Sequence, residues 1–405
     1  MYKTTENKIF HLDGKHYLFL VNSSALFEIE NETRQLLDEI SMNRDSFSTT
    51  GNYSETELIS LENIGAVRRI NPSQNVSSRK IIPTEPLSSL ICILSGDCNL
   101  RCSYCYADHG AYKHEKTLAK EETVLKGIDF LFNESAGRDM GFTFFGGEPL
   151  LNFSVLKSAV KYAKNKASAM KRKIGFSITT NATLLNEDVV SFLLDEGVSI
   201  TVSIDGTRNV HNHGRKFPGG DGSYDAVVKK LDKLFKRSGE KTINARVTVV
   251  HGQVNLIEAF SHLSSVGFKN IGFSPVSSTN PLYALTDDDL HTFTDGFAKL
   301  AGKFLSSALE GKLFGFSNLT HLVQLLHDGI NRQYPCGGGL GLMGMDTDGR
   351  LFVCHRFIGN KKFLIGDISR GIDKAFQKDL LNTLNIENKS LCQAFWAKYL
   401  CGGWC

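Results

Sequence analysis

Three closely spaced cysteines are the residues of this chain best suited to chemistry. Cys98, Cys102 and Cys105 are spaced C-x3-C-x2-C and follow an apolar run at 90–94 that predicts a buried strand. Thiolates are soft ligands that bind iron–sulfur clusters or zinc. Three ligands suit a [4Fe–4S] cluster, because one iron is left open for a small molecule. The alternatives are a zinc site completed by His109, or three unrelated core cysteines.

This spacing, with Tyr104 directly before the last cysteine, resembles the radical S-adenosylmethionine (SAM) enzymes. In that family three cysteines hold three irons, and the amino and carboxylate groups of SAM bind the fourth. The resemblance therefore implies a [4Fe–4S] cluster on Cys98, Cys102 and Cys105. It also implies SAM as a second cofactor, with Tyr104 beside it.

A glycine pair ends the second predicted strand, in the motif Gly146-Gly147-Glu148-Pro149. Paired glycines let a backbone approach a ligand closely, and the proline fixes the turn. A similar motif in the radical SAM family contacts the amino group of SAM through its carbonyls and its glutamate. A carboxylate facing a cationic amine is a sound interaction. The alternative is a tight strand–helix turn with a solvated Glu148.

Further polar residues follow the third and fourth predicted strands. The resemblance puts Ser203 near the ribose or carboxylate of SAM and Arg215 on the carboxylate, which the guanidinium fork matches bidentately. Asp205 joins this set, although Asp-Gly is also a common turn pair. Asn181 is expected to line the same pocket, although Asn at a strand end is usually a turn residue. His211 is expected at the surface.

Alternating strand and helix patterns from 88 to about 310 must position these residues. Six βα units with short connections predict a parallel sheet with helices outside, hence an α/β fold. Eight units would close a full barrel, so six predict an open, partial (β/α)6 barrel with its site at the C-terminal strand ends. Strands are predicted at 89–94, 141–145, 174–180, 198–204, 243–250 and 270–275, and helices at 120–134, 153–170, 186–196, 222–237, 255–266 and 286–310.

Residues 1–80 predict a small α+β module before the barrel. Three short strands at 8–13, 16–21 and 25–29 precede two helices, from Asn31 and near 54–64, and a strand at 67–70. The module resembles the winged-helix-like peptide-recognition element of enzymes that modify ribosomal peptides, which binds a leader peptide as an added strand. The alternative is a plain extension packed on the barrel. Residues 71–87, with several Pro and Ser, predict a linker.

The C-terminal region, 311–405, holds five further cysteines. A hairpin at 342–354 about Asp348-Gly349, with an expected type I′ turn, brings Cys336 near Cys354. The spacing C-x12-G-x4-C resembles the first half of the SPASM (twitch-like) auxiliary-cluster domain of peptide-modifying radical SAM enzymes. Phe395 stands where one cysteine of the second half belongs. By the resemblance, one auxiliary cluster takes Cys336, Cys354 and Cys405 and the other takes Cys392 and Cys401, and we expect at least one auxiliary [4Fe–4S] cluster.

Composition limits the remaining possibilities. The chain has 405 residues, 41% of them hydrophobic, and a net charge of +3, too small to indicate nucleic acid or a membrane surface as partner. No signal peptide and no run of 18 apolar residues occurs. The nine cysteines cluster in two groups, which favours metal ligation in a reducing, cytoplasmic compartment over a disulfide framework.

The sequence therefore predicts a radical SAM peptide maturase with domains at 1–80, 81–310 and 311–405. Its expected partners are a precursor peptide with a leader segment and a flavodoxin- or ferredoxin-like electron donor. A thioether cross-link is the leading product, and no side chain is expected to act as a catalytic nucleophile. The rivals are a carbon–carbon cyclophane-forming maturase and an anaerobic sulfatase maturase. The sulfatase-modifying relatives carry an Asp where this chain has His355. A zinc-binding peptide chaperone is the alternative of another class.

Overall fold

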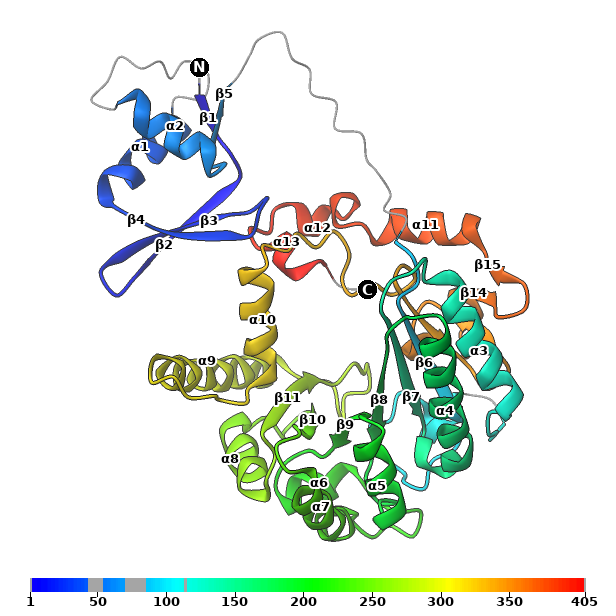
Figure 1. Ribbon diagram of the computed structural model, residues 1–405. Coiled ribbons are helices and arrows are strands. Elements are labelled where there is room, and N and C mark those ends of the chain that lie inside the picture. The colour runs from blue at the N-terminus through cyan, green and yellow to red at the C-terminus, as the bar shows by residue number, and fades with distance from the viewer. Residues whose placement is uncertain (1, 43–53, 70–84, 113–114, 404–405) are drawn as a thin grey trace. The chain divides into compact units, whose positions relative to one another are not determined.

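The computed structural model describes residues 2–42, 54–69, 85–112 and 115–403 (Figure 1). The chain divides into two compact units. The larger unit contains Thr84–Thr320 and Gly338–Gln377, and the smaller contains Met1–Pro83, His321–Gly337 and Lys378–Cys405. Among the described helices, none has the length and apolar character needed to cross a lipid bilayer.

The larger unit is built on an open sheet with the strand order β11-β10-β9-β8-β7-β6-β12-β13-β14-β15. The strands from β6 to β11 pair in parallel, each with its neighbour. This confirms the predicted α/β fold with a large, mostly parallel sheet. The six strands lie where the sequence predicts them: β6 (Ser89–Ser95), β7 (Met140–Gly146), β8 (Ile174–Thr180), β9 (Ser199–Ser203), β10 (Asn244–Val249) and β11 (Asn270–Pro275).

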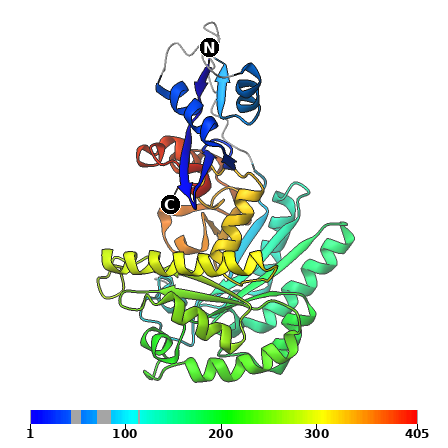
Figure 2. The same ribbon diagram turned by 90° about the vertical axis from the view of Figure 1, so that its left-hand side faces the viewer.

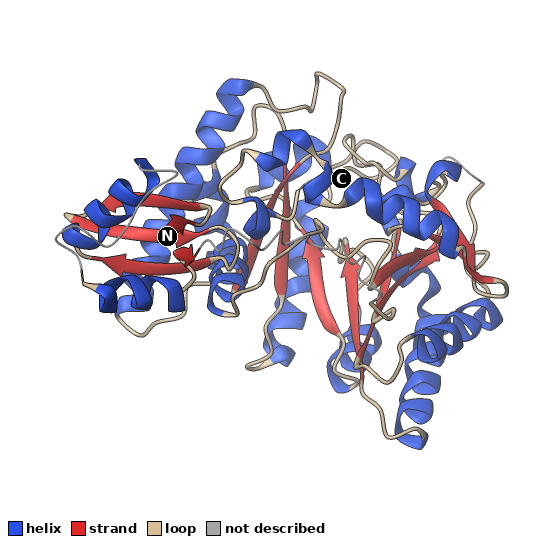
Figure 3. Cartoon of the chain, turned by 90° about the horizontal axis from the view of Figure 1, so that it is seen from above, coloured by secondary structure: helices blue, strands red, loops and turns tan. Residues whose placement is uncertain are grey.

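Helices flank these strands (Figure 3). Each is amphipathic: on α7, for example, Val227, Leu231 and Leu234 are buried, whereas the lysines between them face solvent. In Figure 2 the long helix α9 is drawn in yellow, and it packs against α8. The helices are α3 (Glu121–Glu134), α4 (Phe153–Ala169), α5 (Glu187–Asp195), α6 (Arg208–Gly214), α7 (Tyr224–Ser238), α8 (Leu256–Val266) and α9 (Asp287–Leu309), of which α6 was not predicted.

The pleat of each strand separates core residues from cavity residues. On β7, Phe142 and Phe144 are completely buried, and their rings contact edge to face at 5.3 Å between centroids. Phe145, on the opposite side of the same strand, lines a cavity instead. The fold therefore directs alternate residues of its central strands toward that cavity.

The C-terminal hairpin extends this sheet. β12 (Leu342–Met345) and β13 (Arg350–Phe352) are antiparallel, as predicted, and β12 also pairs in parallel with β6. The expected type I′ turn is wrong, because Gly349 is the only residue of the connection with a positive φ (+90°). β14 (Leu364–Asp367), β15 (Gly371–Ile372) and α11 (Lys374–Leu384) follow.

The smaller unit begins with the three predicted strands, β2 (Asn7–Leu12), β3 (Lys15–Leu20) and β4 (Ala25–Ile29), in an antiparallel sheet. Leu18 and Leu20 pack with Leu36, Leu58 and other apolar residues in one core cluster. The helices α1 (Asn31–Met42) and α2 (Glu55–Asn63) follow, and an unpredicted strand β1 (Tyr2–Thr4) pairs with β5 (Val67–Arg69).

C-terminal segments complete the smaller unit. The Trp396 ring contacts the rings of Phe10 and Phe19, at 4.9 and 5.3 Å between centroids. The buried Lys398 ammonium forms an ion pair with Glu6 at 2.7 Å. The N-terminal module and the end of the chain thus share one compact unit. The segments contain α10 (Ser317–His327), which begins in the larger unit, α12 (Ser390–Gln393) and α13 (Lys398–Cys401).

Candidate active site

The cysteine loop leaves the C-terminal end of β6 and is held by its own side chains. The buried Ser95 hydroxyl donates to the carbonyl of Asp97 at 2.9 Å. The Asp97 carboxylate accepts a hydrogen bond from the Cys98 amide at 2.8 Å and pairs with Lys116 at 2.8 Å. The Leu100 amide donates to Cys98 Sγ at 3.4 Å. The first cysteine therefore has a defined position before any ligand binds.

A second segment, 214–216, holds the rest of the loop. The Ser103 amide donates to the Gly214 carbonyl at 2.9 Å, and the Arg101 amide donates to the Lys216 carbonyl at 2.7 Å. Gly214 is required here, because a Cβ at this position would lie 2.5 Å from the Tyr104 ring. The loop between β6 and α3 is thus anchored to the segment that follows α6.

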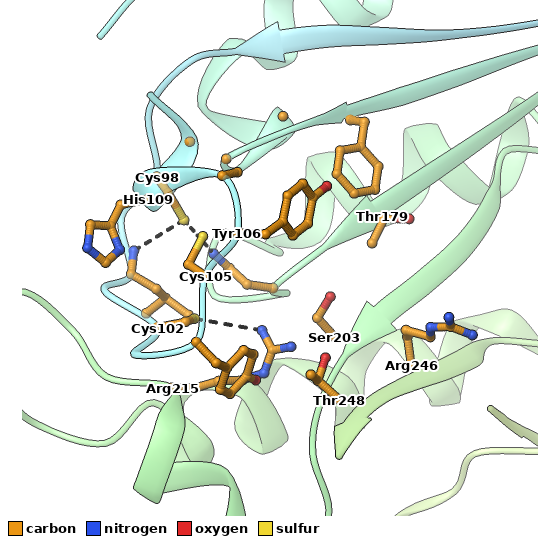
Figure 4. A pocket seen from close by; sticks show the side chains of 18 of the residues that line it. Cys98, Cys102, Cys105, Tyr106, His109, Thr179, Ser203, Arg215, Arg246 and Thr248 are labelled. Atoms are coloured by element: carbon orange, nitrogen blue, oxygen red, sulfur yellow. Dashed lines mark hydrogen bonds between the residues drawn. The ribbon is translucent and has the colours of Figure 1, made fainter. Parts of the chain in front are cut away.

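Two polar side chains, those of Asn181 and Arg215, lie beside the cysteine sulfurs, and Figure 4 shows Arg215 next to Cys102. Asn181 Nδ2 lies 3.7 Å from Cys98 Sγ, and Arg215 Nη1 lies 3.9 Å from Cys102 Sγ. Burial raises the pKa of Cys98 to about 12 and that of Cys102 to about 11. Ligation by a metal would therefore have to supply the energy that ionises these thiols, and the two donors would stabilise the resulting thiolates.

The donor set of the loop fits a [4Fe–4S] cluster. Cys98, Cys102 and Cys105 line one cavity, and in a [4Fe–4S] cluster each thiolate would bind a different iron. His109 lines the same cavity, as the alternative zinc site would require.

The glycine pair after β7 packs against the cysteine loop. A Cβ on Gly146 would lie 2.3 Å from the Ser95 carbonyl oxygen, and a Cβ on Gly147 would lie 2.2 Å from the Asp97 carbonyl oxygen. The Gly147 amide donates to Ser95 O at 2.8 Å, and the Glu148 amide donates to Asp97 O at 2.9 Å. The close approach predicted for these glycines therefore includes the backbone of the cysteine loop.

Glu148 is completely buried and does not line the cavity. Its carboxylate accepts hydrogen bonds from the Asn181 amide at 2.7 Å, the Thr180 hydroxyl at 2.8 Å and the Leu150 amide at 3.1 Å. Burial raises its pKa to about 7, although the three hydrogen bonds act in the opposite direction and lower it. In this geometry Glu148 ties β8 to the turn after β7. The neighbouring Pro149 is also buried and begins a short 3-10 helix.

Asp205 organises the other side of the cysteine loop. Its carboxylate, 3% exposed, accepts hydrogen bonds from Arg215 Nε at 2.9 Å, from the Thr248 amide at 3.0 Å and from the Tyr104 hydroxyl. The Arg215 guanidinium also lies over the Tyr104 ring, 5.5 Å from its centroid. Asp205 is therefore more than a turn residue, because it joins β9, β10 and the cysteine loop.

His211 lies behind this network, and the expectation of a surface position is wrong for it. The side chain is fully buried, with Nε2 2.9 Å from the Ser223 hydroxyl and Nδ1 3.4 Å from the Asp205 amide. Burial lowers its pKa to about 4, so the imidazole is neutral at ordinary pH. The α6 segment turns inward here, which the sequence pattern of a polar loop did not indicate.

The predicted residues Tyr104, Asn181, Ser203 and Arg215 line one cavity of about 440 Å³ together with the three cysteines. Further lining residues were not predicted from the sequence, and they come from β10, from the end of β11, from the cysteine loop and from the turn after β13. The alternation of buried and polar residues along β10 is a sequence signal that could have predicted its two lining residues. The further lining residues include Tyr106, Arg246, Thr248, Ser274, His355 and Arg356.

The C-terminal cysteines divide between the two units. Cys354 belongs to the larger unit, where its Sγ accepts a hydrogen bond from the Arg356 amide at 3.4 Å. The smaller unit contains Cys336, Cys392 and Cys401. Cys405 lies outside the described residues. The predicted partition of ligands between two auxiliary clusters stays a prediction.

Comparison with known proteins identifies the domain. Residues 92–263 match the family model of the Radical SAM superfamily. The cysteine-type anaerobic sulfatase-maturating enzyme of Clostridium novyi is 26% identical over 290 residues, which cover 67% of this chain and 74% of that enzyme. The radical SAM cyclopropyl synthase TigE of Paramaledivibacter caminithermalis is 21% identical over 414 residues, 94% of this chain and 85% of TigE.

Two solved structures share the fold. The structure of anSMEcpe with bound AdoMet has a TM-score of 0.66 at 22% identity and covers 79% of this chain and 89% of its own. Streptococcus suis SuiB bound to its precursor peptide SuiA has a TM-score of 0.52 at 14% identity and covers 100% of this chain and 95% of its own. Residues 92–263 therefore form a radical SAM domain, and the chain is homologous to the anaerobic sulfatase-maturating enzymes and to the radical SAM cyclopropyl synthase TigE.

Proposed function

We propose that this protein modifies a ribosomally made precursor peptide by radical SAM chemistry, with a sulfur–carbon (thioether) cross-link as the product. The observation that carries the proposal is the single cavity at the C-terminal strand ends. It brings the cysteine loop together with the predicted SAM-binding residues Tyr104, Asn181, Ser203 and Arg215. Similarity to TigE and SuiB along almost the whole chain supports a peptide as substrate.

When bound, the cluster and SAM supply a 5′-deoxyadenosyl radical that abstracts a hydrogen atom from the substrate. The chain's own residues hold and orient these groups. Asn181 and Arg215 donate toward the cysteine sulfurs. Arg215, fixed by Asp205, presents a positive charge beside Cys102, where the carboxylate of SAM would lie. Ser203 offers a hydroxyl from the end of β9 for the ribose or the carboxylate.

The smaller unit is the proposed docking site for the leader segment of the peptide. In the sheet order β2-β3-β4, both outer strands present an edge that pairs with no other described strand. A peptide added as a strand would gain a row of main-chain hydrogen bonds, each contributing about 0.5–1.5 kcal/mol. The two helices and the strand pair β1–β5 complete an α+β module, which is the composition expected of a winged-helix-like peptide-recognition element.

The C-terminal cysteines are the proposed ligands of an auxiliary cluster in a SPASM-like domain. By the resemblance, one auxiliary cluster takes Cys336, Cys354 and Cys405. With these three thiolates it would keep one iron open, and an open iron could bind the thiolate of a substrate cysteine during thioether formation.

Carbon–carbon bond formation is the second candidate. It is favoured by the similarity to a cyclopropyl synthase over 94% of the chain. Sulfatase maturation is disfavoured, because the resemblance implies an Asp in sulfatase-modifying enzymes at the position where this chain has His355. That histidine packs against Phe145, at 4.6 Å between ring centroids, and burial lowers its pKa to about 4.

Anaerobic reconstitution tests the proposed chemistry. We expect the wild type to bind iron and to form 5′-deoxyadenosine from SAM when a reductant is added. Replacing Cys98, Cys102 and Cys105 together by Ala should abolish this reaction. Cys92→Ala is the matched control, because Cys92 is buried in β6 outside the cavity. Formation of 5′-deoxyadenosine by the triple variant at the wild-type rate would refute the proposed function.

A further inference from the structure

Two arginines of the cavity remain unexplained by the binding of SAM. Arg246 lies on β10, where Ala245 and Val247 are buried and the alternate residues Arg246 and Thr248 line the cavity. Arg356 follows β13, a strand on the other side of β6 in the sheet order, and lines the same cavity. Two guanidinium groups thus enter one cavity from distant strands.

Neither guanidinium forms an ion pair with a carboxylate of the described residues. Arg356 lies over the ring of Tyr106, 4.6 Å from the ring centroid. Both arginine side chains remain exposed where they line the cavity. Partial desolvation, and then the positive charge of Arg356, lower the pKa of Arg246. The two like charges repel each other, and an anion bound between them would remove this repulsion. Arg215, by contrast, already has Asp205 as its partner.

The carboxylate of SAM is a poor match for this pair. SAM carries one carboxylate, and in the proposed complex it binds the cluster iron beside Cys98, Cys102 and Cys105. Figure 4 shows Arg246 at the opposite end of the cavity, with Ser203 and Thr248 between it and the cysteines. The adenosine end of SAM is uncharged. The carboxylate of SAM would therefore leave Arg246 without a counter-ion, and we look for its anion in the substrate.

We propose that Arg246 and Arg356 bind the carboxylate of an acidic side chain, Asp or Glu, at the residue of the peptide that is modified. This inference rests on the proposed function and names its substrate class. Guanidinium groups match carboxylates bidentately, so the pair fixes the orientation of the substrate side chain as well as its charge. With the carboxylate held at the far end of the cavity, the methylene hydrogens of the same side chain point back toward the cysteine loop.

Short peptides test this assignment directly. Four fluorescent hexapeptides, acetylated and amidated at their ends, would differ only in a central Asp, Asn, Glu or Gln. Their affinity for the reconstituted, SAM-loaded enzyme would be measured by fluorescence anisotropy. We expect the acidic peptides to bind about tenfold more tightly than their amides, a difference of about 1.4 kcal/mol. Because the peptide ends are blocked, a terminal carboxylate cannot produce this preference.

Arginine variants test whether Arg246 and Arg356 cause the preference for acidic peptides. R246Q and R356Q should each remove most of the preference for the acidic peptides, and R246K should retain part of it, because it keeps the charge but not the fork. R237Q is the matched control, since Arg237 is exposed on α7 and pairs with Asp195 outside the cavity. The affinity for SAM, measured in the same variants, should stay within about twofold of the wild type (about 0.4 kcal/mol).

Two results would overturn the assignment. One is a wild type that binds all four peptides equally, or binds none of them. The other is an R246Q variant that loses affinity for SAM but keeps the peptide preference, because Arg246 would then serve the carboxylate of SAM. Formation of 5′-deoxyadenosine by the wild type is measured separately, so a failure of the proposed function remains distinguishable from a failure of this inference.

Discussion

The two cysteine-bearing regions of the molecule are held in different ways. Backbone amides of the loop 98–105 donate hydrogen bonds to the Asp97 carboxylate and to the carbonyls of Gly214 and Lys216. Asn181 and Arg215 donate toward its sulfurs. The segment 392–401 is held by the Trp396 ring and by the Lys398–Glu6 ion pair. Polar contacts orient thiols toward a ligand, whereas aromatic packing holds a segment without orienting its sulfurs.

Phe395 distinguishes the second cysteine-bearing region from the first. It occupies the position where the resemblance expects a cysteine, is 44% exposed, and lies 6.0 Å from the Trp396 ring between centroids. By the resemblance, the first region carries a cysteine at each expected ligand position, whereas the second carries an aromatic residue at one of them. We therefore expect variants to separate the two regions by the size of their effects.

Gly147→Ala should have the largest effect. A Cβ would lie 2.2 Å from the Asp97 carbonyl oxygen, so the cysteine loop must move. We expect a loss of more than about 4 kcal/mol in the free energy of unfolding and a loss of about four irons per chain after reconstitution. Gly141→Ala in β7 is the control, because its Cβ would make only an ordinary contact at 3.5 Å with Ser89. Retention of iron by the Gly147 variant would contradict the preformed loop.

Asp205→Asn comes next. The substitution leaves the buried Arg215 without its ion-pair partner, which should cost about 3–5 kcal/mol in chemical denaturation. Asp225→Asn is the matched control: its pair with Arg208 is exposed, so we expect a loss below about 1 kcal/mol. Equal losses in the two variants would show that Asp205 does not hold the cysteine loop.

Glu148→Gln should change how stability depends on pH. The folded-state pKa of about 7 lies above the unfolded value of 4.5, so the folded protein binds more protons between these values. The stabilisation linked to this proton is complete below the unfolded pKa and is lost as the pH rises through about 7. Relative to the variant, the wild type should lose about 3 kcal/mol between about pH 5 and pH 8.

Glu122→Gln is the control for the pH measurement. Glu122 is exposed, and its hydrogen bond with Lys126 lowers the pKa of its carboxyl. Its contribution to stability is therefore present above the unfolded pKa and is lost as the pH falls. The free energy of unfolding of the wild type, relative to the Glu122 variant, should therefore rise with pH, whereas relative to the Glu148 variant it falls with pH. A flat difference for Glu148 across the whole range would mean that its carboxylate is ionised in the folded protein.

Phe395→Cys should have the smallest effect on stability and the clearest effect on metal content. Because Phe395 is partly exposed, we expect a loss below about 1 kcal/mol. The radical SAM cluster and one auxiliary cluster together would give about eight irons per chain, and a thiol at 395 should raise this number by about four. Phe395→Ser removes the ring without adding a ligand and should leave the iron count unchanged. An unchanged count in the Cys variant would exclude a second auxiliary cluster on this segment.

Local sequence pattern predicted the barrel strands and their helices to within two residues, because alternation and helical spacing are local signals. It missed the parallel pairing of β12 with β6, which joins residues about 250 positions apart. It also missed β1, whose partner β5 lies more than 60 residues away. Pairings of this kind depend on the assembled fold, and no short window of sequence contains them.

Local sequence pattern was likewise sufficient for only part of the candidate site. The spacing of the cysteines and the Gly-Gly-Glu-Pro motif could be read directly, and so could the polar residues at the strand ends. The roles of Asp205 and His211 could not, because Asp-Gly is a frequent turn pair and a histidine in a polar segment is usually exposed. Arg246 carried a usable signal, since it alternates with buried residues on a strand that ends at the cavity.

The contact between Trp396 and the β2–β3 hairpin has a consequence for biosynthesis. Phe10 and Phe19 leave the ribosome early, and their partner ring follows more than 370 residues later. At about 5–20 residues per second, the nascent chain exposes these two rings for roughly 20–80 s. Closing a chain loop of this length costs only slightly more conformational free energy than closing a shorter one, but it delays formation of the contact. The smaller unit is therefore completed last, after the larger unit has been translated.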